Sequence, residues 1–99
     1  MYLFNRTIET QGEMAKIVPI LLDMKKAVQD AGVDATFWIG GSGYKNGTVI
    51  FTAPYENLSD RAEANAKLAA SKAVMEASQR FNPHVRALEL DTIIRYLKG

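Results

Sequence analysis

The alternation of apolar and polar residues predicts a β-hairpin in the middle of the chain. Residues 36–39 and 48–53 are rich in β-branched and aromatic side chains, which favour strands. Between them, Asn46-Gly47 is typical of a tight hairpin turn, because both residue types accept positive φ angles.

Two further strands are expected near the ends of the chain. Residues 2–8 carry apolar side chains on both parities, which indicates a strand covered on both faces. Residues 88–96 alternate, with Leu88, Leu90, Thr92, Ile94 and Tyr96 on one face and charged residues among those on the other.

A helix is expected between the first strand and the hairpin. Its apolar stripe recurs at helical spacing up to Gly32 and consists of Met14, Ile17, Val18, Leu21, Met24 and Val28. Thr10 and Glu13 have the spacing of a capping box. Pro19 predicts a kink or a loosened first turn, because it lacks a backbone donor.

A second helix is expected from Asp60 to about Phe81. Five alanines fall on one line of this helix: Ala62, Ala66, Ala69, Ala73 and Ala77. This stripe predicts close packing on the sheet, so that Ala69→Leu should be strongly destabilising. Leu68 and Met75 lie on the opposite side, where they predict a small exposed patch or a contact with another chain.

The resulting strand and helix order, β-α-β-β-α-β, predicts a ferredoxin-like α+β fold with a four-stranded antiparallel sheet. Right-handed crossovers place both helices on one face of such a sheet and leave the other face bare. The strands are nevertheless apolar on both faces, as Val49 and Phe51 against Ile50 illustrate. We therefore expect a homodimer in which a second copy covers the bare face.

Composition limits the classes of partner. The 99 residues predict one domain, residues 1–99, and 12 basic against 11 acidic side chains give no charge block that would attract nucleic acid or a membrane. The chain has no cysteine, which suits a cytoplasmic location and excludes thiol chemistry. No cluster of histidines and carboxylates has metal-ligand spacing, so no metal site is predicted.

The element order, the two-faced strands and the segment 55–68, Tyr-Glu-Asn-Leu-Ser-Asp-Arg-Ala-Glu-Ala-Asn-Ala-Lys-Leu, resemble the dimeric α/β-barrel superfamily. That superfamily includes antibiotic-biosynthesis-type monooxygenases, stress-responsive barrel proteins and NIPSNAP-like proteins. The resemblance covers nearly the whole chain. It implies two sheets closed face to face into a barrel, and a small pocket between the sheet and the helices of each subunit.

Asn5-Arg6 is the most suggestive polar pair, because both side chains are costly on a buried strand unless they are hydrogen-bonded or meet a ligand. The pair resembles an Asn-Arg dipeptide on the first strand of haem-degrading members of the superfamily, whose Asn lines the pocket. The Trp and helix-borne His of those members have no counterpart here. We consider Asn5 a candidate catalytic residue and Arg6 a candidate substrate ligand, with pairing of Arg6 to Glu89 or Asp91 as the structural alternative.

Three other side chains are candidates for the same site. His84 is the only histidine and hence the obvious general base, although its place in a turn favours a structural role. Trp38 could stack on a planar ligand, although a strand aromatic is more often a core residue. Tyr44 could donate a phenolic hydrogen bond to a substrate or lie at a rim.

Two other functions are disfavoured by their motifs. Residues 40–43, Gly-Gly-Ser-Gly, lack the Lys-Ser or Lys-Thr and the following helix of a phosphate-binding loop. Residues 48–53 lack the basic and aromatic signature of an RNA-recognition domain.

These observations favour a small-molecule-binding barrel protein. Its catalytic form would be a cofactor-independent oxygenase or isomerase acting on a small planar substrate. The alternative is a non-catalytic ligand-sensing or interaction module. The sequence identifies no cofactor and leaves open whether the protein is an enzyme.

Overall fold

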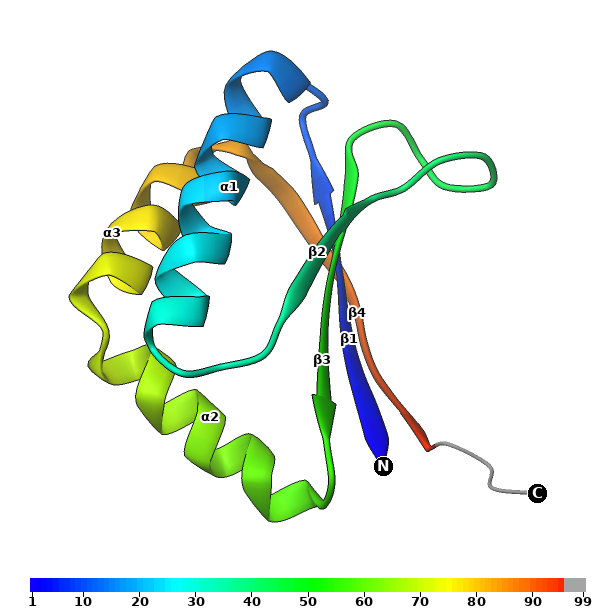
Figure 1. The fold of residues 1–99 in the computed structure, drawn as a ribbon. Coiled ribbons are helices and arrows are strands. Elements are labelled where there is room, and N and C mark those ends of the chain that lie inside the picture. The colour runs from blue at the N-terminus through cyan, green and yellow to red at the C-terminus, as the bar shows by residue number, and fades with distance from the viewer. Residues whose placement is uncertain (96–99) are drawn as a thin grey trace.

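The computed structural model describes residues 1–95, with the backbone alone for residues 88–90 (Figure 1). The strands are β1 (Tyr2–Thr10), β2 (Thr36–Ile39), β3 (Thr48–Tyr55) and β4 (Val85–Arg95). The helices are α1 (Met14–Asp30), α2 (Leu58–Ala70) and α3 (Lys72–Phe81), and a short 3-10 turn, η1 (Asn82–His84), follows α3. Tyr96, expected at the end of the last strand, lies outside the described residues.

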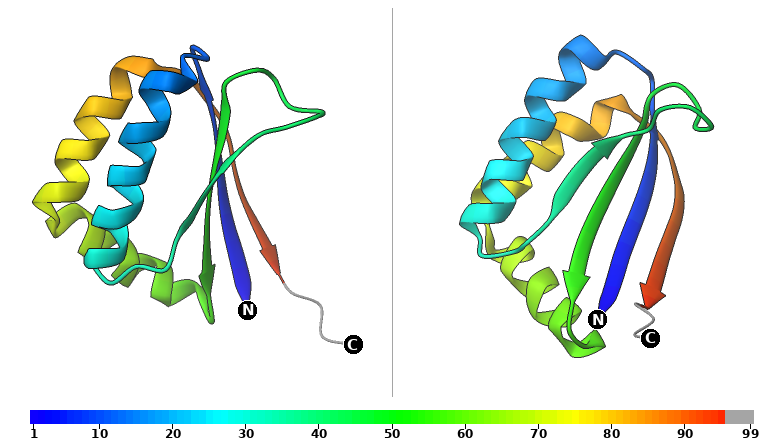
Figure 2. Two further views of the ribbon diagram at one scale, coloured as in Figure 1. Left: turned by 45° about the horizontal axis from the view of Figure 1, so that its top comes forward. Right: turned by 45° about the vertical axis from the view of Figure 1, so that its right-hand side comes forward.

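The four strands form one antiparallel sheet in the order β2-β3-β1-β4. All the helices lie on one side of this sheet, and α1 and α3 lie side by side (Figures 1 and 2). The predicted ferredoxin-like α+β fold is therefore confirmed. No helix in the described part of the chain is long and apolar enough to cross a bilayer.

The connection between β2 and β3 is a loop, residues 40–47, and the prediction of a tight two-residue hairpin turn is wrong. Gly47 has a φ of 86°, but no residue other than glycine has a positive φ in the described part of the chain, so Asn46 does not adopt one. The backbone N–H of Thr48 donates to the carbonyl of Lys45 and closes the last turn of the loop. The loop projects away from the helices, beyond the other face of the sheet (Figure 1).

Helix α1 packs on the sheet as its apolar stripe predicted. Ile17, Ile20 and Leu21 form a core cluster with Val49 of β3 and Phe81 of α3. The helix continues through Pro19.

The predicted capping box of α1 does not form. The Thr10 hydroxyl is buried and donates to the carbonyl of Gly47 at 2.6 Å, and it accepts from the N–H of Gly12. The hydroxyl that was expected to cap the helix is therefore bonded to Gly47 and Gly12, and α1 has no side-chain cap.

The second connection is two helices and not one, because it breaks at Ser71. The Ser71 backbone is extended, and its side chain accepts a hydrogen bond from the N–H of Val74 as the N-cap of α3. The break turns α2 and α3 in different directions (Figure 1).

The expected alanine stripe does not face the sheet. Ala77 is buried, whereas the other four alanines, Ala62, Ala66, Ala69 and Ala73, are exposed. Leu68 is half-buried under α2, so its predicted exposure is wrong, and Met75 is 52% exposed as expected. The break at Ser71 changes the rotation of one helix relative to the other, so no single stripe can span both.

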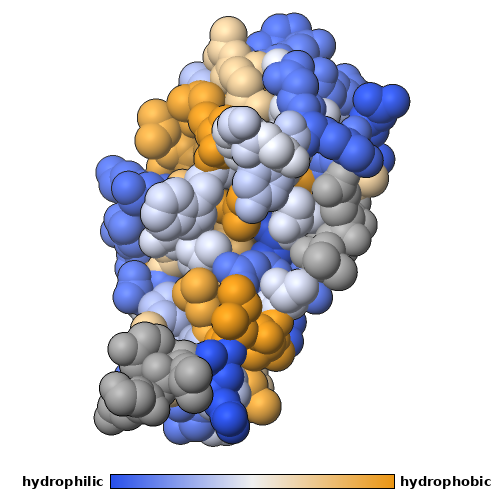
Figure 3. Space-filling view, turned by 90° about the vertical axis from the view of Figure 1, so that its right-hand side faces the viewer, coloured by the Kyte–Doolittle hydropathy of each residue, from blue (hydrophilic) through white to orange (hydrophobic). Residues whose placement is uncertain are grey.

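The two faces of the sheet differ in cover. Phe4, Ile8 and Val49 are among the side chains that point toward the helices. On the opposite face, a polar row crosses all four strands in register and consists of Thr36, Thr52, Asn5 and Thr92. Figure 3 shows this opposite face, where two groups of hydrophobic residues are separated by paler and hydrophilic ones.

Candidate functional site

A cavity of about 380 Å³ lies between the helix-covered face of the sheet and the helices. It falls within the usual size range of small-molecule sites. Residues on both sides of the Ser71 break contribute to its wall, with Arg61, Asn65 and Leu68 from α2, and Val74, Ser78 and Phe81 from α3. We call this cavity the inner pocket.

Aromatic side chains form the sheet side of the inner pocket. The rings of Phe37 and Phe51 meet edge to face with their centroids 5.1 Å apart, and those of Phe4 and Phe51 meet likewise at 6.3 Å. Such edge-to-face pairs hold one another in fixed orientations. The pocket therefore has a firm apolar floor against which a flat or aliphatic group can pack.

Arg6 lines the inner pocket and is paired with Asp91 on the neighbouring strand. Its Nε and Nη2 atoms donate to the two carboxylate oxygens of Asp91 at 3.0 and 3.1 Å. The prediction that Arg6 pairs with Glu89 or Asp91 is confirmed for Asp91, whereas the Glu89 side chain lies outside the described part. The hydrogen bonds from Arg6 hold the pKa of Asp91 below its usual value.

Arg61 is a residue of the inner pocket that the sequence reasoning did not single out. Its guanidinium carbon lies 4.1 Å from the centroid of the Phe4 ring, a close cation–π contact. Among the side chains that the structure describes, which exclude those of residues 88–90, no carboxylate lies within ion-pair distance of Arg61. Arg61 lies in the first turn of α2 beside Asp60 and Glu63, and a charged residue in such a sequence is expected to be exposed to solvent.

Two neutral polar side chains lie with Arg61 in the wall of the pocket. Asn65 follows Arg61 by four residues and therefore lies on the same side of α2. Burial raises the pKa of the Tyr55 phenol, against a smaller lowering by the Arg61 charge, so Tyr55 is a protonated donor at neutral pH.

Asn5 and Trp38 do not lie in the inner pocket, which corrects the expectation that they converge there with Arg6. Successive residues of a strand point to opposite faces, so Arg6 faces the helices and Asn5 faces away. Trp38 lies on the same outer face as Asn5, where its Nε1 donates to the Thr52 hydroxyl at 2.9 Å. Catalysis by Asn5 and ligand binding by Trp38 in this pocket lose their geometric basis.

His84 and Tyr44 are also outside the inner pocket. His84 is half-buried in η1, and its carbonyl accepts a hydrogen bond from the N–H of Gln11. Tyr44 is 53% exposed in the loop between β2 and β3. Neither side chain is within the wall of the cavity, and their proposed roles as general base and substrate ligand stay predictions.

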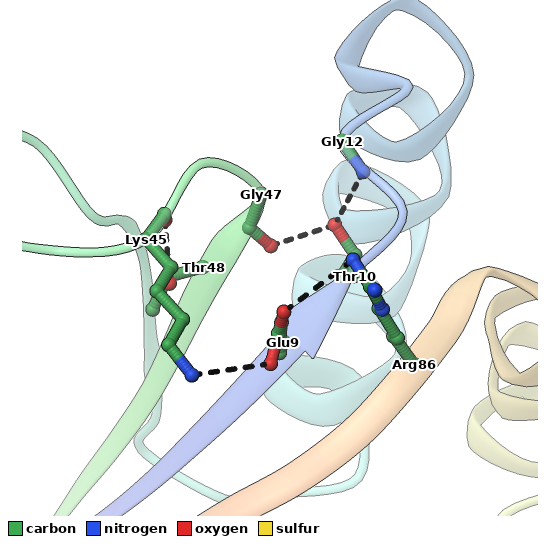
Figure 4. A network of polar contacts seen from close by, with 7 residues as sticks. All are labelled: Glu9, Thr10, Gly12, Lys45, Gly47, Thr48 and Arg86. Carbon is green, nitrogen blue, oxygen red and sulfur yellow. Dashed lines mark hydrogen bonds and ion pairs between the residues drawn. The ribbon is translucent and has the colours of Figure 1, made fainter.

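A second polar cluster joins the end of β1 to the loop of residues 40–47 (Figure 4). Glu9, whose side chain is only 15% exposed, lies 3.8 Å from both Lys45 and Arg86. Beside it, a Cβ on Gly47 would lie 2.7 Å from the carbonyl oxygen of Thr10, so only glycine fits. The contacts are between protein groups, and we regard the cluster as an anchor for the loop.

No group of three or more metal-ligating side chains occurs among the described residues. Among the described residues, the inner pocket is the site with the clearest geometry for binding. It combines an aromatic floor with the guanidinium groups of Arg6 and Arg61, the phenol of Tyr55 and the amides of Asn65 and Asn82.

Solved structures with the same fold cover nearly the whole chain. An uncharacterized NIPSNAP domain protein from Burkholderia xenovorans has a TM-score of 0.82 and 23% identity over 98% of this chain and 95% of that one. A NIPSNAP family protein from Agrobacterium tumefaciens has a TM-score of 0.77 and 21% identity over 95% and 90%. An antibiotic biosynthesis monooxygenase has a TM-score of 0.69 and 12% identity over 95% and 94%.

The chain shares the fold of these NIPSNAP and antibiotic biosynthesis monooxygenase structures. The resemblance inferred from the sequence is therefore confirmed at the level of the subunit fold. No protein-family model matches the chain, and no curated protein is significantly similar to it in sequence. Identities this low show the fold alone.

Proposed function

We propose that this protein binds a small, largely apolar molecule in the inner pocket. The observation that carries the proposal is the cavity of about 380 Å³ with its floor of Phe4, Phe37 and Phe51. Burying an apolar molecule there is favourable by about 25 cal/mol for each Å² removed from water. Native mass spectrometry of protein purified from its host should reveal a retained small molecule.

A matched pair of variants tests this proposal. Leu68 lines the pocket, whereas Met75 is 52% exposed on the adjoining helix. The uncharged dye N-phenyl-1-naphthylamine should fluoresce on binding to the native protein, with excitation beyond the absorption of tryptophan. Leu68→Trp should abolish this signal by filling the cavity, and Met75→Trp should leave it intact. Equal signals from the two variants would show that the dye binds elsewhere.

Catalysis is the second candidate function, in the form of a cofactor-independent oxygenase or isomerase acting on a small planar substrate. Arg61 and the protonated Tyr55 supply cationic and hydrogen-bond stabilisation for an enolate or phenolate in an apolar site. The wall of the pocket contains no histidine or carboxylate within the described residues, so binding is the function that the geometry supports best. Oxygen uptake with polyphenolic substrates, measured with an electrode, would establish the oxygenase form.

We also propose that the protein works as a homodimer through the outer face of the sheet. Trp38 and Ile94 on this face are 55% and 56% exposed, and a second copy of the sheet would cover them. Such an interface should bury roughly 1,200 Å² or more. Light scattering at micromolar concentration should report a dimer, and a stable monomer would exclude this assembly. A cytoplasmic location stays a prediction from composition.

A further inference from the structure

The inner pocket contains two guanidinium groups with different surroundings. Both lie near the Phe4 ring, with their central carbons 4.1 Å from its centroid for Arg61 and 5.6 Å for Arg6. Arg6 donates two hydrogen bonds to Asp91, and the negative charge of this carboxylate balances the positive charge of Arg6. Arg61 makes no such pair with any described side chain, although its charge also helps to lower the pKa of Asp91. Two guanidinium groups and one carboxylate therefore leave one positive charge in excess among the described side chains of this part of the pocket.

The uncompensated charge lies in a partly dry setting. Arg61 is half-buried against an aromatic ring, and burial is also what raises the pKa of the nearby Tyr55. Ion pairs are stronger where water is partly excluded than on an open surface. An anion that reached Arg61 would therefore be held more firmly than one bound to an exposed arginine.

The neighbouring polar groups are also of the kind that an anion requires. The phenol of Tyr55 has one hydrogen-bond donor. The amide of Asn65 has two donors and lies on the same side of α2 as Arg61. Neither side chain donates a hydrogen bond to another described residue. A carboxylate can accept from a guanidinium, a phenol and an amide at the same time.

We propose that the ligand of the inner pocket is a carboxylate with an apolar body, whose anionic group binds Arg61 while the body lies on the floor of Phe37 and Phe51. This inference rests on the proposed binding function and specifies the class of ligand. The single net charge favours a monoanion. The apolar remainder of the wall, which includes Met24, Val28 and Leu68, favours an aromatic or aliphatic body.

Paired probes test the inference by calorimetry. 2-Naphthoate and decanoate carry the anion, and 2-naphthamide and decanamide are their uncharged counterparts. Each carboxylate should bind the native protein about tenfold more tightly than its amide, as expected for one charge-assisted hydrogen-bond pair. Equal affinity for the acid and the amide would overturn the anion inference and leave the binding function standing. Failure of all four probes to bind would overturn the binding function as well.

Variants locate the charge that is responsible. Arg61→Gln should bind the carboxylate and the amide with about equal affinity, and Arg61→Lys should keep part of the preference for the carboxylate. Arg80→Gln is the matched control, because Arg80 pairs with Asp23 on the outer surface of α1 and α3 and should leave the preference unchanged. Asp91→Asn should increase the preference, since it frees Arg6. If Arg61→Gln folds and retains the full preference, Arg61 is not the anion ligand.

Discussion

The two faces of the sheet carry different side chains, although the same strands form both. Toward the helices lie Phe4 and Phe51, with Arg6 held to Asp91 at the wall of a cavity. Away from the helices lies a row of short polar side chains, flanked by exposed Trp38 and Ile94. The inner face thus borders a cavity, whereas the outer face is an open surface with exposed apolar side chains.

The largest expected difference between the faces is in stability. Ile17 is fully buried over the inner face, and Ile17→Ala should cost about 2–5 kcal/mol of unfolding free energy. Ile94 is 56% exposed on the outer face, and in a single subunit Ile94→Ala should cost no more than about 0.5 kcal/mol.

Urea denaturation at several protein concentrations measures both variants of this pair. If the outer face is a dimer interface, the loss in Ile94→Ala should grow with protein concentration. Equal, concentration-independent losses in the two variants would contradict the distinction between the faces.

A second comparison concerns the alanines of the last two helices. Ala77 is 4% exposed between α3 and α1, and Ala77→Leu should destabilise by about 1–3 kcal/mol through overpacking. Ala69 is exposed on α2, so Ala69→Leu should change the free energy of unfolding by no more than about 0.5 kcal/mol. This replaces the strong effect expected from the sequence. The melting temperatures of the two variants measure this difference. A large loss of stability in Ala69→Leu would show that the alanine stripe faces the sheet.

Acid should weaken the inner face slightly through Asp91. The pKa of Asp91 is lowered in the folded state, so its pair with Arg6 stabilises the fold above the ordinary pKa of about 3.9. That contribution disappears as the pH falls through the folded-state pKa. Because the pair is over one-third exposed, its contribution is about 1 kcal/mol or less.

The melting temperature of Asp91→Asn checks this effect. It should lie slightly below that of the native protein near neutrality, and the two should converge as the pH falls through the folded-state pKa of Asp91. A gap that persists in acid would show that Asp91 acts through packing and not through its charge.

The smallest expected effect is on Trp38 fluorescence. Trp38 is the only tryptophan and lies on the outer face, so decanoate in the inner pocket should leave its emission unchanged. Dilution that dissociates a dimer should shift the emission to longer wavelength, because the indole would become more hydrated. A strong response to decanoate with none to dilution would reverse the assignment of the faces.

The fold could be predicted from the sequence because periodicity is a local property. The alternation in β1 and β3 and the helical stripe of α1 each follow from neighbouring residues. The break at Ser71 was missed because it contains neither glycine nor proline, although serine is a common N-cap. Because one continuous helix was assumed, the alanine stripe was wrongly expected to face the sheet.

The site could be predicted only in part. Arg6 and its pairing with Asp91 follow from the cost of a charge on an apolar strand. The strand period of two already implies that Asn5 and Arg6 face opposite sides, and Trp38 shares a face with Asn5 for the same reason. The place of Arg61 depends on its contact with Phe4 near the start of β1, which is a tertiary contact without a local signal.

The position of β1 in the sheet also has a consequence for synthesis of the chain. β1 pairs on one side with β3 and on the other with β4, although β4 begins only at Val85. At about 5–20 residues per second, a ribosome needs roughly 4–15 s to travel from Thr10 to Val85. During that interval one edge of β1 has no native partner, and exposed strand edges invite pairing with other chains. The nascent protein should therefore depend on chaperones more than its small size suggests.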